Sequence, residues 1–570
     1  MHIDSFIRNV QIYNSYFKTF IPGNAAINEG KFVYIGEDDA LSLEAAEVVD
    51  GENQFMIPGL TDIHLHIESS MITPATFSSA VLQNGVTTIV AEPHELANVF
   101  GLKGVQEMVK ASKECIVDIF TGIPSSVPST QLETSGGSID YEDIDLLMKE
   151  NSEDIACLGE VMDFKSVISE PDGVTNQLLK KIREKYPKLV IEGHFPRLVG
   201  LDLCKFMNAG IGSDHTQQTI AGMEERMKQG MFIEIQEKSM TPEIMEYLIT
   251  NNVKEHFCFI TDDVMPDSFV KHGHLNHIVK KAIGMGMKPE DAIYAATFTP
   301  NRHMQLHDRG SIAPNKIADF LLVSDLQEFT IEEVYKYGVK VYDSQVGHTF
   351  QQKPFKFPNE FYSSVKISEL SKSDFQIHAP NENGTVQVRA MMVSDGTTFT
   401  KEKIDELSCE SNLVNYEESA YCFIGIFERY GKNGNRSVGL VGGDTIKRGA
   451  IATTYAHDHH NLLVIGKNEE DMAIAANEVI HNQGGYCSVV DGKILSSLKL
   501  PIGGILSDEP LEEVAKEVKR LRESMHDLGY KHYNPIMSLS TIALPVSPEL
   551  KITDLGLVNV NEGKIVDLFV

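Results

Sequence analysis

The pattern of hydrophobic and polar positions changes near residue 55. From there, short apolar runs alternate with longer amphipathic stretches, such as residues 75–83, 101–113, 176–185 and 242–251. The apolar runs are FMIPGLTDIHLH ending at His66, VTTIVAEPHE ending at Glu95, CIVDIFTGIP, IACLGE ending at Glu160, LVIEGH ending at His194, GIGSDH ending at His215, MFIEIQE, and FCFITDD ending at Asp263. Apolar strands that alternate with helices predict βα units and a parallel sheet.

The repeat of these units favours a closed barrel over an open sheet. Eight units within residues 55–308 match a (β/α)₈ barrel, which typically has about 250 residues. A doubly wound sheet is the alternative, and it is disfavoured because no GxGxxG follows the first strand. We therefore expect an α/β fold with a (β/α)₈ barrel at residues 55–308.

The flanks of the barrel have a different pattern. Residues 6–12, 17–21 and 31–35 are β-rich and are separated by turn residues at 22–24 and 28–30, while short strands return after residue 309. We expect residues 1–54 and 309–350 to form one small composite β domain, a β-sandwich. A polar connection at 351–375 leads to a separate α/β domain at 376–570, with strands near 437–441, 462–465 and 486–490 and helices near 471–481 and 511–525.

Composition narrows the class of partner. Lys and Arg number 50 against 81 Asp and Glu, a net charge of −31, which argues against nucleic-acid binding because that affinity comes from basic side chains. The seven cysteines include no CxxC pair, which indicates a reducing compartment. No signal peptide and no apolar run of about 18 residues is evident, so we expect a cytoplasmic protein that does not enter a membrane.

Several predicted strands end in metal-binding side chains. A lone HxH is weak evidence, since the sequence has three, at 64–66, 272–274 and 457–459. In such a barrel, however, the carboxyl ends of the strands converge on the active site. The candidate ligands there are His64, His66, Glu160, His194, His215 and Asp262. They suit one or two ions of Zn, Mn or Fe, with Glu160 placed to bridge two of them.

This ligand set predicts hydrolysis. A metal pair lowers the pKa of bound water, and Asp262 can accept a proton from it. The target would be a planar electrophilic carbon in an amide, a lactone, a cyclic amide or an amino-heterocycle. A catalytically silent metal-binding or scaffold protein is disfavoured because the ligand set is complete.

Longer motifs resemble a known family. PGLTDIHLHIESS at 58–70 is similar to the first-strand signature of the amidohydrolase superfamily, and its HIESS continuation resembles the bacterial adenine deaminases. The same holds for GVTTIVAEPHELANVFG at 85–101, TDDVMPDSFVKHGHLNHIVKKAI at 261–283, KRGAIATTYAHDHHN at 447–461, LPIGGILSDEP at 500–510 and SLSTIALPVSPELKITDLGLVNV. The resemblance covers most of the chain, including a C-terminal domain that other amidohydrolases lack.

The resemblance implies hydrolytic deamination of adenine to hypoxanthine and ammonia, a purine salvage reaction, at a binuclear Mn, Fe or Zn centre held by the six residues above. Glu92 stands where the family more often has Asp, and Val264 and Met265 follow the double Asp where polar residues are expected. The alternative is therefore a paralogous amidohydrolase acting on another aminopurine, a cyclic amide or a lactone. We expect a small purine as the ligand and a homo-oligomer, a dimer, as the assembly.

Further polar residues near the strand ends have two interpretations each. Glu68 and Glu95 are candidate catalytic residues beside Asp262, and the candidate substrate-binding residues are His94, Ser69 and Asp263. Glu68, Glu92, His94 and Glu95 would carry protons to the purine or bind further metal, or else they are solvated loop carboxylates and helix caps. The histidines at 272 and 274 line the pocket or lie in a surface loop. The cluster at 457–460 closes over the barrel or is an ordinary loop.

Overall fold

The computed structural model describes residues 2–38 and 43–570. Its centre is a set of parallel strands in the predicted order. They are β6 (Leu60–Leu65), β7 (Val86–Ala91), β8 (Asp118–Ile123), β9 (Ile155–Val161), β10 (Val190–Gly193), β11 (Ser213–Asp214), β12 (Phe232–Ile235) and β13 (Phe257–Phe259). Each lies within or beside one of the apolar runs, so the repeat of apolar and amphipathic segments correctly predicts them.

Backbone hydrogen bonds curl these strands towards a barrel. β6 to β10 form one sheet and β11 to β13 another. The two sheets meet on one side where Gly212 N donates to Ile191 O at 2.9 Å, and on the other where Asp262 N donates to His64 O at 3.1 Å. His66 N donates in turn to Asp262 O at 3.3 Å. First and last strands are therefore neighbours, as in a TIM-barrel-like α/β fold and unlike an open doubly wound sheet.

Helices follow the strands and cover the barrel. Threonine side chains begin several of them: Thr73, Thr219 and Thr241 each accept a hydrogen bond from a first-turn backbone N–H. The helices are α1 (Pro74–Leu82), α2 (His94–Phe100), α3 (Leu102–Lys113), α4 (Tyr141–Asn151), α5 (Phe164–Ser169), α6 (Val174–Lys185), α7 (Gly200–Asn208), α8 (Ile220–Lys228), α9 (Pro242–Thr250), α10 (Pro266–His272), α11 (Leu275–Gly284) and α12 (Pro289–His303).

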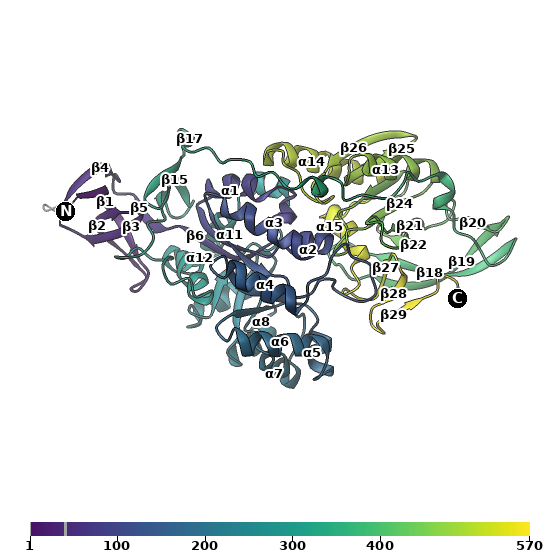
Figure 1. Cartoon of the computed structure of the whole chain (residues 1–570), viewed down its shortest axis with the longest axis horizontal. Helices are drawn as coiled ribbons and strands as arrows, with labels where there is room; N and C mark the ends of the chain where they lie inside the picture. The colour runs from purple at the N-terminus through teal and green to yellow at the C-terminus, as the bar shows by residue number, and fades with distance from the viewer. Residues whose placement is uncertain (1, 39–42) are drawn as a thin grey trace.

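The two flanks of the barrel share one sheet. β5 (Phe55–Pro58) pairs antiparallel with β14 (Phe320–Asp325), which joins the N-terminal strands to those after residue 309. The other members are β1 (His2–Asn14), β2 (Thr19–Asn28), β3 (Lys31–Gly36), β4 (Glu44–Asp50), β15 (Thr330–Lys336), β16 (Val339–Asp343) and β17 (Gly347–His348). This composite sheet lies at the N-terminal end of the molecule in Figure 1.

The predicted turn at Pro22-Gly23-Asn24 is wrong. These residues lie inside β2, where Gly23 pairs with Val10 of β1. A side chain at Gly23 would meet Gly36 O at 2.9 Å, so the glycine permits close approach of β3 rather than a reversal. The chain instead turns at residues 15–18, where the Asn14 side chain accepts hydrogen bonds from the Tyr16 and Phe17 amides, both at 3.0 Å.

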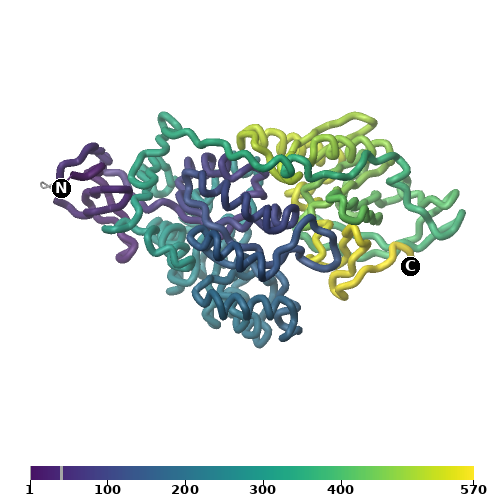
Figure 2. The backbone as a smooth tube through the Cα atoms, in the orientation of Figure 1, coloured from purple at the N-terminus to yellow at the C-terminus, as the bar shows by residue number. Residues whose placement is uncertain are grey.

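Residues 349–383 lead from the composite sheet to the C-terminal region. This segment crosses beside the barrel helices (Figure 2), and its Phe361 ring stacks on Phe100 with centroids 4.0 Å apart. The Gln352 side chain accepts from Ile116 N at 3.0 Å after α3. The connection is therefore packed onto the barrel rather than free of it.

The C-terminal region contains a nine-stranded mixed sheet in its described residues, with helices against it. Its strands are β18 (Gly384–Val393), β19 (Lys401–Glu410), β20 (Leu413–Val414), β21 (Cys422–Phe427), β22 (Arg436–Gly443), β23 (Ala450–Thr453), β24 (Leu462–Gly466), β25 (Gly485–Val490) and β26 (Lys493–Lys499). The helix α13 (Glu469–His481) lies between β24 and β25. After β26 come α14 (Leu511–Leu528), α15 (Pro535–Ser540) and a small sheet of β27 (Leu550–Thr553), β28 (Gly556–Asn559) and β29 (Lys564–Val566). Figure 1 shows this region on the opposite side of the barrel from the composite sheet.

Within residues 2–38 and 43–570, none of the helices combines the length and the hydropathy needed to cross a bilayer.

Candidate active site

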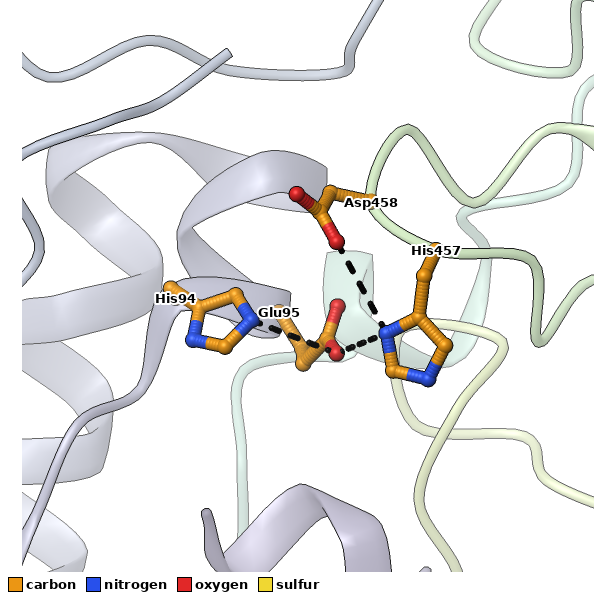
Figure 3. A group of neighbouring side chains, drawn as sticks. All are labelled: His94, Glu95, His457 and Asp458. Carbon is orange, nitrogen blue, oxygen red and sulfur yellow. Dashed lines mark ion pairs between the residues drawn. The ribbon is translucent and has the colours of Figure 1, made fainter. Parts of the chain in front are cut away.

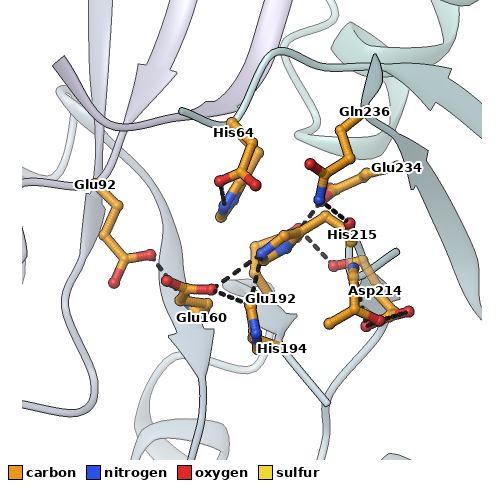
Figure 4. Close-up of polar contacts among 12 residues, drawn as sticks. His64, Glu92, Glu160, Glu192, His194, Asp214, His215, Glu234 and Gln236 are labelled. Atoms are coloured by element: carbon orange, nitrogen blue, oxygen red, sulfur yellow. Dashed lines mark hydrogen bonds and ion pairs between the residues drawn. The ribbon is translucent and has the colours of Figure 1, made fainter. Parts of the chain in front are cut away.

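The six predicted ligands meet at the carboxyl ends of the barrel strands. His64 and His66 lie at the end of β6, Glu160 lies in β9, and His194, His215 and Asp262 follow β10, β11 and β13. Figure 4 shows four of them facing one another, with Glu92 beside Glu160. Because the strands are parallel, their carboxyl ends share one rim, and side chains from distant parts of the sequence converge there.

The Glu160 carboxylate stands between two groups of imidazoles. Its Oε2 lies 2.9 Å from His194 Nδ1 and 3.0 Å from His215 Nε2. Its Oε1 faces the other way, 3.8 Å from His66 Nε2. One oxygen for each group is the arrangement that a bridging carboxylate requires.

Asp262 completes the group on the first strand. Its Oδ1 lies 3.6 Å from His66 Nε2 and 4.0 Å from His64 Nε2. His66 Nδ1 donates to Glu92 O at 3.1 Å, which leaves Nε2 free to bind an ion. Among the described residues, His64 Nε2 is buried without a hydrogen-bond partner.

The imidazole nitrogens and carboxylate oxygens of these six residues suit a divalent metal ion. Burial, and then the neighbouring His215, lower the pKa of His64 well below its usual value, so this imidazole is neutral, as a ligand must be. The set contains only nitrogen and oxygen donors, which suit Zn, Mn or Fe. Closely spaced groups in it are His64 with His66 and Glu160, and Glu160 with His194 and His215.

Glu92 supports the central carboxylate from β7. Its Oε2 accepts a hydrogen bond from Glu160 N at 2.7 Å. Burial, and then the charge of Glu160, raise the pKa of Glu92 to about 8. A side chain at Gly159 would lie 2.2 Å from this carboxyl group, so the glycine before Glu160 makes room for it.

The residues predicted to hold substrate surround the same rim. Ser69 Oγ donates to Asp263 Oδ1 at 2.5 Å, so Asp263 turns towards the 3-10 turn Ile67–Ser70 while Asp262 turns towards the histidines. Glu68 in that turn is fully buried, and burial raises its pKa to about 7. His94 packs against His66, with ring centroids 4.5 Å apart.

The interpretation of Glu68, Glu92, His94 and Glu95 as solvated loop residues is wrong, because all four are buried. Of the histidines at 272 and 274, only the first is at the surface, and the second is packed in the protein interior. His274 is buried between Phe77 and Phe269, whereas the histidine at 272 is exposed.

The cluster at 457–460 is not an isolated loop, because it closes onto the start of α2 (Figure 3). His457 Nδ1 contacts Glu95 Oε1, and His460 Nε2 contacts Glu95 Oε2. His94 Nε2 approaches Glu95 Oε1 at 3.4 Å from the other side, and Asp458 lies beside His457 at 3.8 Å. The C-terminal region therefore contributes side chains to the edge of the site.

A buried polar layer beneath the site was not predicted. Asp62 accepts from Thr261 Oγ1 at 2.6 Å and faces His274, with burial raising its pKa to about 7. Glu192 accepts from Ser213 Oγ at 2.5 Å and pairs with His303 at 3.0 Å. Period-two spacing was the available signal, since it places Asp62 on the same strand face as His64 and His66, and Glu192 on the same face as His194.

Comparisons with known proteins agree on one family. The model of the amidohydrolase family matches residues 55–341, and that of the adenine deaminase C-terminal domain matches residues 397–564. An adenine deaminase 2 of Shouchella clausii is 54% identical and covers 100% of this chain and 99% of its own. The adenine deaminases of Clostridium perfringens (strain ATCC 13124) and Lactobacillus delbrueckii subsp. bulgaricus are 48% and 40% identical over 100% of this chain, and over 100% and 99% of theirs.

Proposed function

The chain belongs to the adenine deaminase family of amidohydrolases, and on that premise we propose that adenine is hydrolysed to hypoxanthine and ammonia at the carboxyl rim of the barrel. The predicted family is confirmed by relatives 48–54% identical over the whole chain and by the C-terminal domain. The chain is accordingly a hydrolase acting on C–N bonds. The observation that carries the location is the Glu160 carboxylate with one oxygen towards each imidazole group.

We propose that this rim holds a binuclear centre of Mn, Fe or Zn. His64, His66 and Asp262 would hold one ion, His194 and His215 the other, and Glu160 would join them. When bound, such a centre lowers the pKa of water and polarises the atom under attack.

The protein residues around this centre would then move protons. Asp262 faces the imidazoles of His64 and His66 and would accept a proton from the attacking water, for delivery towards the purine. Glu68 and Glu95 would complete the transfer to the ring nitrogen and the departing amine. His94, Ser69 and Asp263 would orient the base, because they surround the rim where β6, β7 and β13 end.

An assay of purified protein with defined metal content tests the function. Adenine should release ammonia and change its ultraviolet absorbance, while adenosine should react far more slowly, because the family to which the chain belongs is named for the free base. Other aminopurines serve as controls for a paralogue. Equal rates on adenosine, or no ammonia from adenine with Mn, Fe or Zn, would contradict the proposal.

We further propose the division of the chain into a composite β domain (1–54 with 309–350), a catalytic barrel (55–308) and a C-terminal α/β domain (376–570). The pairing of β5 with β14 supports the first of these. We also propose a homodimer in solution, which sedimentation of the full chain would test.

A further inference from the structure

The carboxylate of Glu95 is held from two distant parts of the chain. Glu95 lies in the first turn of α2, directly after the second barrel strand, and is 1% exposed. Each of its oxygens contacts a different imidazole from the C-terminal region, Oε1 that of His457 and Oε2 that of His460. Both contacts link residues more than 360 positions apart in sequence.

The neighbouring histidines keep the Glu95 carboxyl group ionised. Burial alone would raise the pKa of Glu95, but the imidazoles of His457, His460 and His94 outweigh it and hold the pKa well below the usual glutamate value. Burial likewise opposes the charge on His457, yet Glu95 raises the pKa of His457 to about 9. Burial lowers the pKa of His460, and the charge of Glu95 opposes this shift.

The two histidines differ in what else they can reach. His457 is 6% exposed at the edge of the site, whereas His460 is completely buried and contacts the second oxygen of Glu95. The backbone of His460 is fixed as well: its N–H donates to Ala456 O at 2.8 Å and its carbonyl accepts from the buried Arg429. Arg429 in turn donates to Ser364 Oγ and Gly503 O, both at 2.7 Å.

The held carboxylate faces the metal-binding rim through one intermediate side chain. Glu95 Oε1 lies 3.4 Å from His94 Nε2, and the His94 ring packs on His66. When the Glu95 carboxylate is held in place, the position of the His94 ring and the negative charge of Glu95 next to the rim are held in place as well. The direct contacts of both oxygens with imidazole favour a hydrogen-bonded anchor over an additional bound cation.

We propose that His460 is a positioning residue for the deamination: it acts only through Glu95, and through it the C-terminal region takes part in catalysis. The proposal rests on the proposed function of the barrel site. It goes beyond that function because it gives a role to a side chain that cannot touch substrate.

Kinetics of His460→Ala, His460→Gln and a control in the metal-loaded full chain test the proposal. His460→Ala should lower kcat for adenine by roughly 10–100-fold with KM nearly unchanged, because catalytic geometry is sensitive to displacements of about 1 Å. His460→Gln keeps a donor near the Nε2 position and should recover most of kcat. The control is His459→Gln, because His459 is equally buried in the same loop but its Nδ1 accepts a hydrogen bond from Asn461 N.

A double-mutant cycle with Glu95→Gln separates positioning from a general structural effect. In the Glu95→Gln background, His460→Ala should have no further effect on kcat. The proposal is overturned if His460→Ala costs the same factor in both backgrounds, if His460→Gln is as slow as His460→Ala, or if His460→Ala lowers the metal content, which would make the cluster a cation site.

Crystal structures of the metal-loaded wild type and His460→Ala give a readout that needs no turnover. The Glu95 carboxylate should be displaced in the variant, and an unmoved carboxylate would overturn the proposal. Should the wild type release no ammonia from adenine, the proposed function fails, while this comparison still decides whether His460 positions Glu95. If His460→Ala does not fold, His460→Phe, which removes the donor but keeps a ring in the same space, takes its place in the structures and the cycle.

Discussion

Glu160 is the residue on which the geometry of the site depends. It is the only one of the six predicted ligands whose two oxygens face different imidazole groups among the described residues. Its backbone N–H is held by Glu92, so its position is fixed by the sheet and not by an ion alone. A change that removes its charge and keeps its shape should therefore act on the metals first.

Glu160→Gln should lose one of two bound ions and most of the activity, because two cations would face each other without a shared negative charge. Metal analysis beside kcat measures both effects. Glu192→Gln is the matched control, since Glu192 is bound to Ser213 and His303 and should leave the metal content unchanged. Two retained ions and normal turnover in Glu160→Gln, with loss of metal in Glu192→Gln, would move the bridge to Glu192.

The adjacent carboxylates of Asp262 and Asp263 are separated by their contacts. Asp262 faces His64 and His66, while Asp263 accepts a hydrogen bond from Ser69. Asp262→Asn should lose at least about 10²-fold in kcat, the usual range for general acid–base assistance being 10²–10⁴-fold. Asp263→Asn should lose less and keep its metal. Parallel kinetics and metal analysis would reveal the opposite order if Asp263 is the proton acceptor.

At the scale of single elements, strand β27 buries a lysine without a carboxylate partner among the described residues. Lys551 is 0% exposed, and its Nζ donates to Thr398 O at 2.6 Å and to Thr541 O at 3.0 Å. Burial lowers the pKa of Lys551 to about 7. Between that value and the unfolded pKa of about 10.4, the folded state has lost a proton that the unfolded chain still binds.

Stability should therefore rise with pH over this window through Lys551, since the unfolded state binds more protons there. Lys551→Met removes the effect, and the stability of the wild type relative to the variant should grow by up to about 4 kcal/mol between pH 7 and 10. Thermal midpoints at several pH values measure it. Lys564→Met, at an exposed lysine of β29, should run parallel to the wild type. Parallel curves for Lys551→Met would contradict the prediction.

At the scale of the whole molecule, a buried ion network joins the composite sheet to the barrel. Lys336 at the end of β15 is 2% exposed. Its Nζ lies 2.6 Å from Oδ2 of Asp118 in β8 and 2.5 Å from Oδ2 of Asp319, which precedes β14. Arg309 also binds Asp118, at 2.6 Å. Removing the lysine would leave two carboxylates partly unpaired between the sheets.

Lys336→Met should destabilise the protein by about 3–5 kcal/mol, as expected when one partner of a buried ion pair is removed. Because unfolding entropy grows with chain length, the thermal midpoint of the full chain should fall by roughly 2–4 °C. Lys340→Met, whose lysine pairs with Glu333 and Asp343 on the same sheet and is 33% exposed, should cost no more than about 1 kcal/mol. Equal losses in the two variants would show that the Lys336 network does not anchor the sheet.

Local pattern alone determined a large part of this molecule. The eight barrel strands and the helices near 75–83 and 101–113 could be read from periodicity, because each segment's apolar face is a property of neighbouring residues. The predicted strands also implied that His64, Glu160, His215 and Asp262 converge, since parallel strands place their carboxyl ends on one rim. Motif resemblance added the family.

Only the tertiary structure decided what depends on contacts between distant segments. Pro22-Gly23-Asn24 has turn chemistry, yet pairing with β1 and the close approach of β3 hold it in a strand. Likewise, no local signal joins Glu95 to His457 and His460, which meet only where the C-terminal region packs on α2. Burial of those polar groups, and hence their protonation, is set by segments far away in sequence, because desolvation depends on everything that surrounds a side chain and not on its neighbours in the chain.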